Sequence, residues 1–477
     1  MTAKERINKS LDEVNSTVKT YATGSFLKKF LAFSGPAYMI SVGYMDPGNW
    51  ATDIEGGSQF GYQLLWILLM SNLMALLLQT LSARLGLVTG LDLAQASRQY
   101  YKPWINISLF VYAQIAIIAC DLAEVLGFAI GLKLLTGVDL IYGVIISVFD
   151  TFIILLLQRY GIRKLEAFIL ALVIIIGCSF FVEIFLAKPA IMEVAKGFIP
   201  ISLNNQALLI ATGIIGATVM PHNLYLHSAL VQTRKVEKTS AHIKTALKFN
   251  FIDSSIALNL AFFVNAAILI LSASAFHQNG LNNVGDINDA HQLLNQILGT
   301  QLAPILFAVA LIASGQSSTI TGTLAGQIIM EGYLDLKMKP WLRRLLTRSI
   351  AIIPAVLTLI YFGENKLTAL LITSQVILSM QLGFAVIPLI HFVSDKNMMG
   401  DYVIKNWVKI VAWLSAAIIL GLNIKLVLVH INYWMNADGG WTNVMIKILI
   451  IPALAFSFFL LLYVIVKPLM VKGKSNF

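Results

Sequence analysis

The chain has few charged residues and almost no cysteine. Of its 477 residues only 12% are charged, and two are cysteines. A soluble globular protein carries about 25% charged residues, so the low charge excludes that class. Cys120 and Cys178 both sit in apolar segments, where a free cysteine behaves as a small hydrophobe. They offer neither a disulfide framework nor a cysteine-based metal site.

More than half of the residues are hydrophobic. Hydrophobic residues make up 58% of the chain, and the mean hydropathy is +0.78. Twelve apolar segments are each long enough to cross about 30 Å of hydrocarbon, where only helices or closed barrels satisfy their backbone. The sequence therefore predicts an all-α polytopic membrane protein with about twelve transmembrane helices. The segments are 30–57, 62–86, 103–132, 139–158, 165–187, 207–232, 249–276, 301–332, 345–362, 367–394, 405–431 and 445–467.

The ends and connections of these segments predict the orientation of the chain. The first 28 residues are polar and charged, which indicates that the first apolar segment is a span and not a signal peptide. Lys and Arg are concentrated in the N-terminal tail and after the sixth and eighth spans, whereas the connections assigned to the outside hold only Lys133, Lys188, Lys196 and Lys366. Basic residues favour the cytoplasmic side, so both termini are predicted to be cytoplasmic. The net charge of +10 follows this topology and forms no separate basic domain, which argues against nucleic-acid binding.

Two of the apolar segments contain a polar interruption of the same form. The first reads Asp-Pro-Gly-Asn at 46–49, and the sixth reads Met-Pro-His-Asn at 220–223, so both follow x-Pro-x-Asn. A proline in the middle of a span removes a backbone hydrogen bond and clashes with the preceding turn, so each helix is expected to break there. A matched pair of broken helices one five-span repeat apart indicates an inverted-repeat secondary transporter with its site at the bilayer midplane.

This repeat divides the chain into four parts. We expect a cytoplasmic tail over 1–29, a first inverted repeat of helices 1–5 over 30–187, and a second repeat of helices 6–10 over 207–395. Helices 11 and 12 and a short cytoplasmic tail fill 400–477.

The two breaks offer donor atoms for a cation. Asp46 supplies a carboxylate, Asn49 an amide oxygen and Met220 a thioether, and unwound backbone before Met220 frees carbonyls such as that of Ala217. A charged Asp at mid-membrane is costly, so a cation is its natural partner. Oxygen donors suit Mg, Ca or Mn, and sulfur favours transition metals, so a divalent transition-metal ion fits best. The alternatives are a methionine that only fills a packing gap and prolines that only kink their helices.

Three stretches resemble the signature motifs of the Nramp family, the natural resistance-associated macrophage proteins. They are DPGN at 46–49, ATVMPHNLYLHS at 217–228 and SGQSSTITGTLAGQIIMEGYL at 314–334, and the likeness runs from the first span to about the eleventh. Within the family the chain looks most like a bacterial manganese transporter. The resemblance implies the fold of the neurotransmitter-sodium symporters, with five plus five inverted helices, broken helices 1 and 6, and additional spans at the C-terminus.

The resemblance also implies a function and a site. Such a protein would be a proton-coupled importer of Mn²⁺, and also of Fe²⁺ and Cd²⁺, in a bacterial cell membrane. Asp46, Asn49, Met220 and the carbonyl of Ala217 would coordinate the metal. A subgroup of relatives that carries Mg²⁺ lacks the methionine, so Met220 groups this chain with the transition-metal carriers. Gln375 resembles a position that can add an oxygen ligand when the site closes, and Gln381 is a possible substitute.

Proton coupling requires titratable groups inside the membrane. His222 and His227 follow the break in the sixth span, and histidine titrates nearest to neutral pH. Asp121 and Glu124 are three apart in the third span, so they share a helix face and need partners or a hydrated path. The resemblance implies that these carboxylates form a proton-exit network with arginines near the ninth span. The open alternatives are satisfied buried histidines and a static salt bridge between helices. The candidate arginines are Arg343, Arg344 and Arg348.

The predicted mechanism is alternating access without covalent chemistry, a resident cofactor or an obligate protein partner. The partners are therefore divalent metal ions, protons and the lipid bilayer. An organic-solute symporter on the same fold is one rival, but an acidic Asp46 at the break argues against an anionic substrate group there. A membrane-embedded metalloenzyme is a second rival, but it needs a HExxH-type cluster, and the sequence contains none. A metal channel is a further variant of the transport interpretation.

Overall fold

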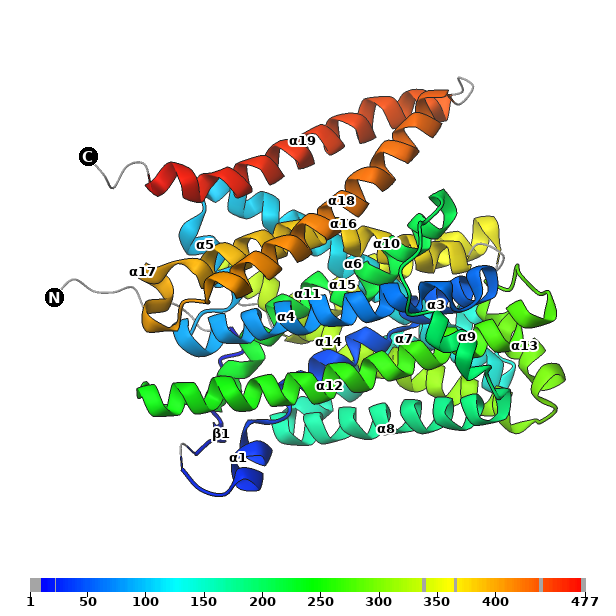
Figure 1. The fold of residues 1–477 in the computed structure, drawn as a ribbon, viewed down its shortest axis with the longest axis horizontal. Coiled ribbons are helices and arrows are strands. Elements are labelled where there is room, and N and C mark those ends of the chain that lie inside the picture. The colour runs from blue at the N-terminus through cyan, green and yellow to red at the C-terminus, as the bar shows by residue number, and fades with distance from the viewer. Residues whose placement is uncertain (1–9, 22, 337–339, 364–366, 437–440, 473–477) are drawn as a thin grey trace.

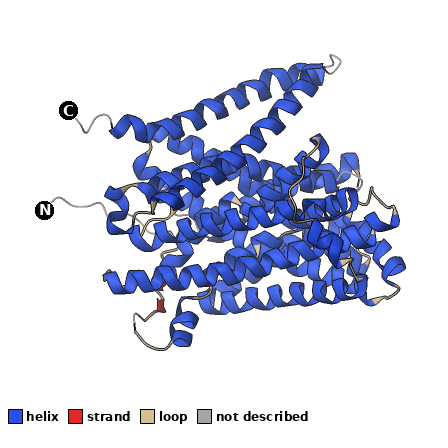
Figure 2. Ribbon diagram, viewed as in Figure 1, coloured by secondary structure: helices blue, strands red, loops and turns tan. Residues whose placement is uncertain are grey.

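The structure is a computed structural model, and it describes residues 10–21, 23–336, 340–363, 367–436 and 441–472. The side chains of residues 150–159 and 343–348 are among those it does not describe. This part of the chain is almost entirely helical, as Figure 2 shows, with the loops gathered mainly at the two ends of a bundle. Helices dominate because each can pair its own backbone groups where no water is present.

The first half of the chain forms the following elements. They are β1 (Val18–Lys19), α1 (Phe26–Phe33), α2 (Pro36–Ser41), η1 (Gly43–Met45), α3 (Pro47–Phe60), η2 (Gly61–Leu64), α4 (Leu65–Thr89), α5 (Leu93–Tyr100), α6 (Pro103–Thr136), α7 (Leu140–Arg159), α8 (Ile162–Ala187), α9 (Ile191–Lys196), α10 (Asn205–Val219), α11 (Pro221–Leu230), η3 (Val231–Thr233) and β2 (Arg234–Lys235).

The second half continues in the same way. Its elements are α12 (Ser240–Ala275), η4 (His277–Asn279), α13 (Ile287–Leu298), α14 (Leu302–Leu334), α15 (Pro340–Phe362), α16 (Leu367–Ser394), α17 (Lys396–Met399), η6 (Gly400–Tyr402), α18 (Asn406–Asn436) and α19 (Trp441–Lys472).

The predicted spans correspond to helices wherever the structure describes them. Within the described residues, eight helical stretches are long and apolar enough to cross a membrane, and one of them, Pro47–Thr89, contains both α3 and α4. Three more apolar helices are shorter over the described residues: Leu140–Phe149, Ile352–Tyr361 and Ile451–Lys467. The first and sixth spans are broken as predicted, into α2 and α3 and into α10 and α11.

The first helix of the first span, α2, begins at Pro36, six residues after the apolar segment that predicted this span begins. Phe30 belongs to α1, which ends at Phe33, and Gly35 then takes a φ of 129° before α2 begins at Pro36. This backbone conformation is open to glycine and strained for other residues, so the chain turns sharply there. Apolar sequence on both sides of the turn concealed it.

The long helices pack along one another, and the last two lie at the edge. Helix α6 packs against α14, α10 against α16, and α12 against α3. In Figure 1, α18 and α19 follow one side of the bundle and diverge from it. Helix α1 and the C-terminal end of α19 lie at one end of the molecule, and α9 and α13 lie at the other.

Residues before the first span are tied to the end of the bundle where α1 lies. Strand β1 pairs in parallel with β2, with Val18 opposite Arg234. The Ser10 hydroxyl donates to Asp92 Oδ2 at 2.6 Å, and the Leu11 amide donates to Glu331 Oε2 at 3.1 Å. This segment therefore links α5, α14 and the connection between α11 and α12.

A buried charge cluster holds the start of α2. The Asp253 carboxylate accepts from the backbone amides of Gly35 at 3.2 Å and Ala37 at 3.0 Å, so it satisfies donors at a helix N-terminus. Arg234 pairs with Glu166 at 2.6 Å beside it and also donates to the backbone before Gly35. The sequence had suggested no role for Asp253.

Candidate functional site

The first break is built by a helix cap. Asp46 has an extended backbone with ψ of 162°, and its Oδ1 accepts from the Asn49 amide at 2.8 Å. An aspartate at this position satisfies a free amide of the first turn, and Pro47 suits the next position because the amide it lacks would be unpaired there. Asp46 is therefore both the residue at which η1 ends and the residue that caps the start of α3.

The second break depends on an unusual backbone at Met220. Helix α10 ends at Val219, Pro221 begins α11, and Met220 between them has φ 39° and ψ 103°. A side chain other than glycine at positive φ costs on the order of 1–3 kcal/mol and persists only where the surroundings hold it. Such outliers cluster at ligand sites and switch regions, so Met220 is a functional candidate on backbone geometry alone.

The two breaks are joined by a pair of reciprocal amide contacts. Asn49 Nδ2 donates to the Ala217 carbonyl at 3.2 Å, and Asn223 Nδ2 donates to the Ile40 carbonyl at 3.2 Å. Asn223 also lies 3.4 Å from Met220 Sδ. The asparagine of each x-Pro-x-Asn motif therefore reaches the other broken helix. Asn223 had not been named as a site residue, although the shared motif was a sufficient signal.

Gln375 of α16 completes this cluster. Its Nε2 donates to Asp46 Oδ2 at 3.3 Å, and a Cβ on Gly48 would lie 1.6 Å from the same nitrogen. Glycine is therefore required at position 48 for Gln375 to approach. Gln381, the possible substitute, lies further along α16, and the described contact with Asp46 comes from Gln375.

The five predicted ligand residues thus meet in one enclosed place. Asp46, Asn49, Ala217, Met220 and Gln375 are each at most 1% exposed. Among the described residues, no three His, Cys, Asp or Glu side chains gather as a metal site. The donors available here are instead one carboxylate, amide and carbonyl oxygens and one thioether sulfur, a mixed set that can bind a dication with some soft character.

The two predicted histidines have different surroundings. His227 contacts Gln79 Oε1 through Nδ1 at 3.1 Å and Asn250 Nδ2 through Nε2 at 3.3 Å, so both ring nitrogens are occupied. His222 Nε2 lies 3.7 Å from Cys120 Sγ, and its Nδ1 has no hydrogen-bond partner among the described residues. Of the two, His222 is the one with a nitrogen available.

The carboxylates of the third span lie where α6 meets α14. Asp121 and Glu124 are buried, and a Cβ on Gly322 would lie 3.3 Å from Asp121 Oδ1 and 2.7 Å from Glu124 Oε1. Gly322 in the SGQSSTITG stretch therefore leaves room for both carboxylates. The proposed partners Arg343, Arg344 and Arg348 have side chains outside the described residues.

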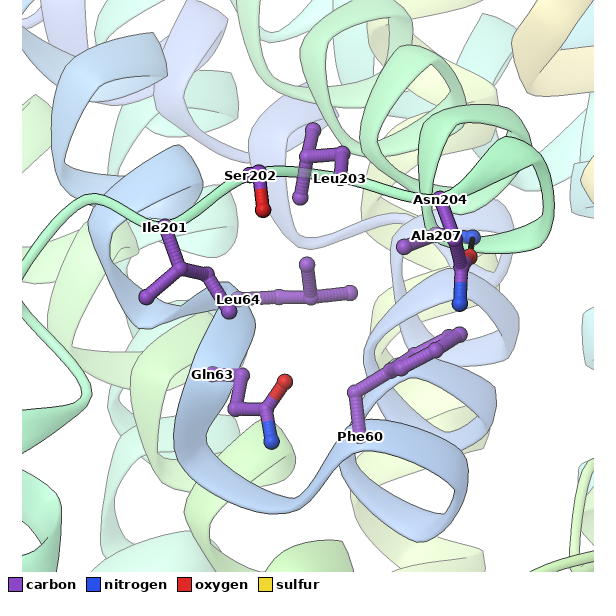
Figure 3. Close-up of a pocket in the computed structure, with 8 residues that line it drawn as sticks. All are labelled: Phe60, Gln63, Leu64, Ile201, Ser202, Leu203, Asn204 and Ala207. Atoms are coloured by element: carbon purple, nitrogen blue, oxygen red, sulfur yellow. Dashed lines mark hydrogen bonds between the residues drawn. The ribbon is translucent and has the colours of Figure 1, made fainter.

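Several cavities open beside the bundle among the described residues, and two of them bear on the predicted site. One of about 640 Å³ is lined by Glu55, Asp286 and Asp289, and by Ile372 and Val376, which flank Gln375 on α16. The smaller one, of about 250 Å³, lies between the end of α3 and the segment entering α10, with Phe60 and Asn204 on its wall (Figure 3). None of the predicted site residues lines this smaller cavity.

Two facing helix breaks with a buried carboxylate, inside a bundle of membrane-length helices, define a membrane transporter with discontinuous helices. The family model described as "Natural resistance-associated macrophage protein-like" matches residues 37–429. The chain belongs to the Nramp family, as its motifs indicated. This is a family of membrane transporters, so the enzyme reading is excluded.

Similar proteins agree with this assignment. The chain is 56% identical over 421 residues to a protein of Mesorhizobium japonicum named divalent metal cation transporter MntH, covering 87% of this chain and 93% of that one. It is 54% identical to a protein of the same name from Bradyrhizobium diazoefficiens, covering 88% and 94% of the two chains.

Solved structures confirm the fold class. The Eremococcus coleocola manganese transporter, in complex with an aromatic bis-isothiourea substituted compound, superposes with a TM-score of 0.88 at 38% identity, covering 96% of this chain and 99% of that one. The nucleobase-cation-symport-1 family transporter Mhp1 superposes with a TM-score of 0.58 at 15% identity, covering 88% and 94% of the two chains, so it shares the fold alone.

Proposed function

We propose that this protein is a proton-coupled importer of divalent transition-metal ions, with Mn²⁺ as its main substrate and Fe²⁺ and Cd²⁺ as further substrates. The observation that carries the proposal is the enclosed set of Asp46, Asn49, Met220 and the Ala217 carbonyl at the paired breaks. The names of the relatives support it, since two are divalent metal cation transporters and one is a manganese transporter.

The ion would bind through rearrangement of contacts that already exist. Asn49 Nδ2 points at Asp46 Oδ1 and at the Ala217 carbonyl, 2.8 Å and 3.2 Å away. When a dication enters, the amide turns so that its oxygen replaces this donor, and the three oxygens and the Met220 sulfur then surround the ion. Gln375 joins through its amide oxygen in the closed site. Asp46 compensates part of the charge that the ion brings into the membrane.

Protons would follow a separate route from the same carboxylate. A proton enters at Asp46, passes to His222 two residues beyond Met220, and leaves through Asp121, Glu124 and the arginines Arg343, Arg344 and Arg348. His227 contributes less in this scheme because both of its nitrogens already have partners. The broken helices rock between outward-open and inward-open states while the ion crosses.

We also propose the domain boundaries of the chain and its orientation in the membrane. The two repeats cover 30–187 and 207–395, and the tails at 1–29 and after helix 12 face the cytoplasm of a bacterial cell membrane. The common end of the molecule at which α1 and the end of α19 lie supports tails on one side. The transported ions are substrates, and the scheme uses no resident cofactor or obligate protein partner.

The decisive experiment uses purified protein in proteoliposomes, with Mn²⁺ uptake and lumenal pH recorded together. The native protein is expected to take up Mn²⁺ and acidify the lumen. Asp46→Asn removes the charge that holds the ion and should lower uptake at least about tenfold, since losses around metal ligands are of that order. Asp401→Asn, the same change at an exposed site, is the matched control.

Three results would contradict the proposal. Mn²⁺ uptake without acidification rejects proton coupling, and full uptake by Asp46→Asn rejects the site. Uptake of an organic solute with no binding of radioactive Mn²⁺ favours an organic-solute symporter.

A further inference from the structure

A cysteine and a histidine from different helices meet directly beside the proposed transport site. Cys120 lies on α6, and His222 lies on α11 two residues after Met220. Cys120 Sγ is 3.7 Å from His222 Nε2 and 3.4 Å from Glu124 Oε1, one turn further along α6. All three residues are at most 2% exposed.

These separations match those between ligands of one tetrahedral metal ion. With Zn–S of about 2.3 Å and Zn–N of about 2.0–2.1 Å, a tetrahedral angle sets the sulfur and nitrogen about 3.5 Å apart. A carboxylate oxygen at about 2.0–2.2 Å from the metal stands about 3.5–3.7 Å from the sulfur. The observed 3.7 Å and 3.4 Å therefore need shifts of only a few tenths of an ångström to accept an ion.

The imidazole is suitably placed to act as a ligand. His222 is 1% exposed, its Nε2 faces the Cys120 thiol, and its Nδ1 has no partner among the described residues. Metal binding through Nε2 therefore breaks no existing hydrogen bond except the weak contact with the thiol. The described residues hold no complete set of three His, Cys, Asp or Glu ligands, so an ion here would take further donors from water or from Glu124 after a small movement.

We propose that Cys120 and His222 form a second metal site, selective for thiophilic divalent cations such as Zn²⁺ and Cd²⁺. On binding, the Cys120 S–H bond breaks, a sulfur–metal bond forms, and the proton leaves to water. Thiolate is a soft ligand, and N- and S-containing sites hold Zn²⁺ more tightly than Mn²⁺, which stands lowest in the order of divalent affinities. The site therefore discriminates against the proposed main substrate.

An ion held at this second site slows transport, so Zn²⁺ inhibits Mn²⁺ uptake and Cd²⁺, although it is transported, inhibits its own uptake as it fills the second site. The bound ion ties α6 to α11, the half-helix that begins at the second break, and transport by alternating access requires that half-helix to move. It also occupies His222, which receives the proton from Asp46 in the proposed route. This consequence rests on the proposed function, whereas metal binding by Cys120 and His222 does not.

The chain provides its own control for the binding experiment, because it has two cysteines. Cys178→Ser removes the exposed thiol of α8 and leaves Cys120 as the sole cysteine. Cd²⁺ added to this purified variant should produce thiolate-to-metal charge-transfer absorption, which the proposed transport site cannot give because it contains no thiol, and the band should saturate when one thiolate-bound ion is held per protein. Cys120→Ser, which keeps Cys178, should lack the band. Absence of the band in Cys178→Ser, or its full retention in Cys120→Ser, overturns the site.

The histidine is tested in the same background. His222→Ala combined with Cys178→Ser should weaken Cd²⁺ binding at least about tenfold, as expected on loss of a group supporting a metal site. Unchanged affinity would mean that the thiol binds without the imidazole, and it would overturn the two-ligand site.

A transport measurement distinguishes failure of the second metal site from failure of the proposed function. Zn²⁺ is titrated against Mn²⁺ uptake in proteoliposomes, with each variant normalised to its own uninhibited rate. The half-inhibitory Zn²⁺ concentration should be at least about tenfold higher for Cys120→Ser than for Cys178→Ser. Equal inhibition overturns the slowing of transport by this site. Absence of Mn²⁺ uptake in the native protein overturns the proposed function, while the absorption band still decides the second site.

Discussion

Asp46 and Met220 each have two roles: each sets the backbone at a helix break, and each offers an atom to the candidate metal site. Asp46 uses Oδ1 to cap α3, which leaves Oδ2 facing Gln375. Met220 holds the positive φ that ends α10 and carries the sulfur that lies 3.4 Å from Asn223. Most substitutions of Asp46 or Met220 therefore change both the backbone at the helix break and the atoms offered to a metal ion. Only a substitution that preserves one of these two features can separate them.

Met220→Ala separates the two roles because alanine keeps the Cβ and so the same backbone preference. Loss of the soft donor should reduce the preference for transition metals over hard cations. We expect Mn²⁺ uptake to persist and Ca²⁺ to become a competitor, by at least several-fold in half-inhibitory concentration. Met74→Ala, at a buried methionine of α4, is the control. A variant that excludes Ca²⁺ as well as the native protein would show that the thioether is not the selectivity filter.

At the scale of helices, glycines allow the broken helices to approach their neighbours. A Cβ on Gly127 of α6 would lie 2.1 Å from Pro47 Cβ and Cγ, and one on Gly216 of α10 would lie 2.2 Å from the Gln375 carbonyl. Real Cβ atoms do not come this close to other atoms, so α6, α10 and α16 can surround the breaks only with glycine at these positions.

Gly127→Ala should push α3 away from α6. Overpacking of this kind costs about 1–3 kcal/mol, so we expect the apparent unfolding temperature to fall by a few degrees and Mn²⁺ uptake to fall with it. Gly177→Ala in α8 is the matched control, since no heavy atom outside its own helix backbone lies within 4 Å of the added Cβ. It should leave the unfolding temperature unchanged or raise it, because alanine favours helix. Equal behaviour of the two variants would contradict the close-approach argument.

At the scale of the whole molecule, the residues before the first span join distant parts of the bundle. Ser10 donates to Asp92, which also caps α5 by accepting from the Gln95 amide at 2.8 Å. Burial raises the pKa of the Asp92 carboxyl to about 6, while the hydrogen bond from Ser10 acts in the opposite direction. Asp92 lies between α4 and α5, outside the membrane-spanning helices.

The raised pKa of Asp92 predicts a pH dependence of stability. Its folded pKa of about 6 exceeds the ordinary 3.8, so the folded state binds the proton more tightly and this contribution to the unfolding free energy falls as pH rises from about 4 to about 6. Asp92→Asn keeps a good helix cap and removes the titration. The unfolding temperature of the native protein minus that of Asp92→Asn should therefore decrease over this range and level off above it.

Ser10→Ala provides the second measurement. Without the hydroxyl donor the pKa of Asp92 should rise further, which extends the decline to higher pH. Parallel curves for the native protein and Asp92→Asn from pH 4 to 7 would show that Asp92 does not titrate in this way.

Most residues of the candidate site could be predicted from the local sequence, whereas residues whose contacts lie far along the chain could not. Asp46, Asn49, Ala217 and Met220 could be predicted as ligands because charge and proline stand out in apolar segments and because the two motifs match. Asp253, Asn223 and Cys120 were missed as contact-making residues, since their partners lie far along the chain. Short helices such as α9 and α13 were missed because they are too short to form an apolar span.

The amino-acid sequence by itself determined the helical membrane architecture, the positions of the two breaks and the types of donor atom at them. These follow from hydropathy and from proline chemistry, which act within one helix. Only the tertiary structure decided which side chains lie in contact with one another. Gln375 hydrogen-bonds Asp46 beside Gly48, and Cys120 faces His222. Both ring nitrogens of His227 contact side chains of other helices, those of Gln79 and Asn250. Such contacts depend on how helices rotate and approach one another, and that is set by packing over the whole bundle.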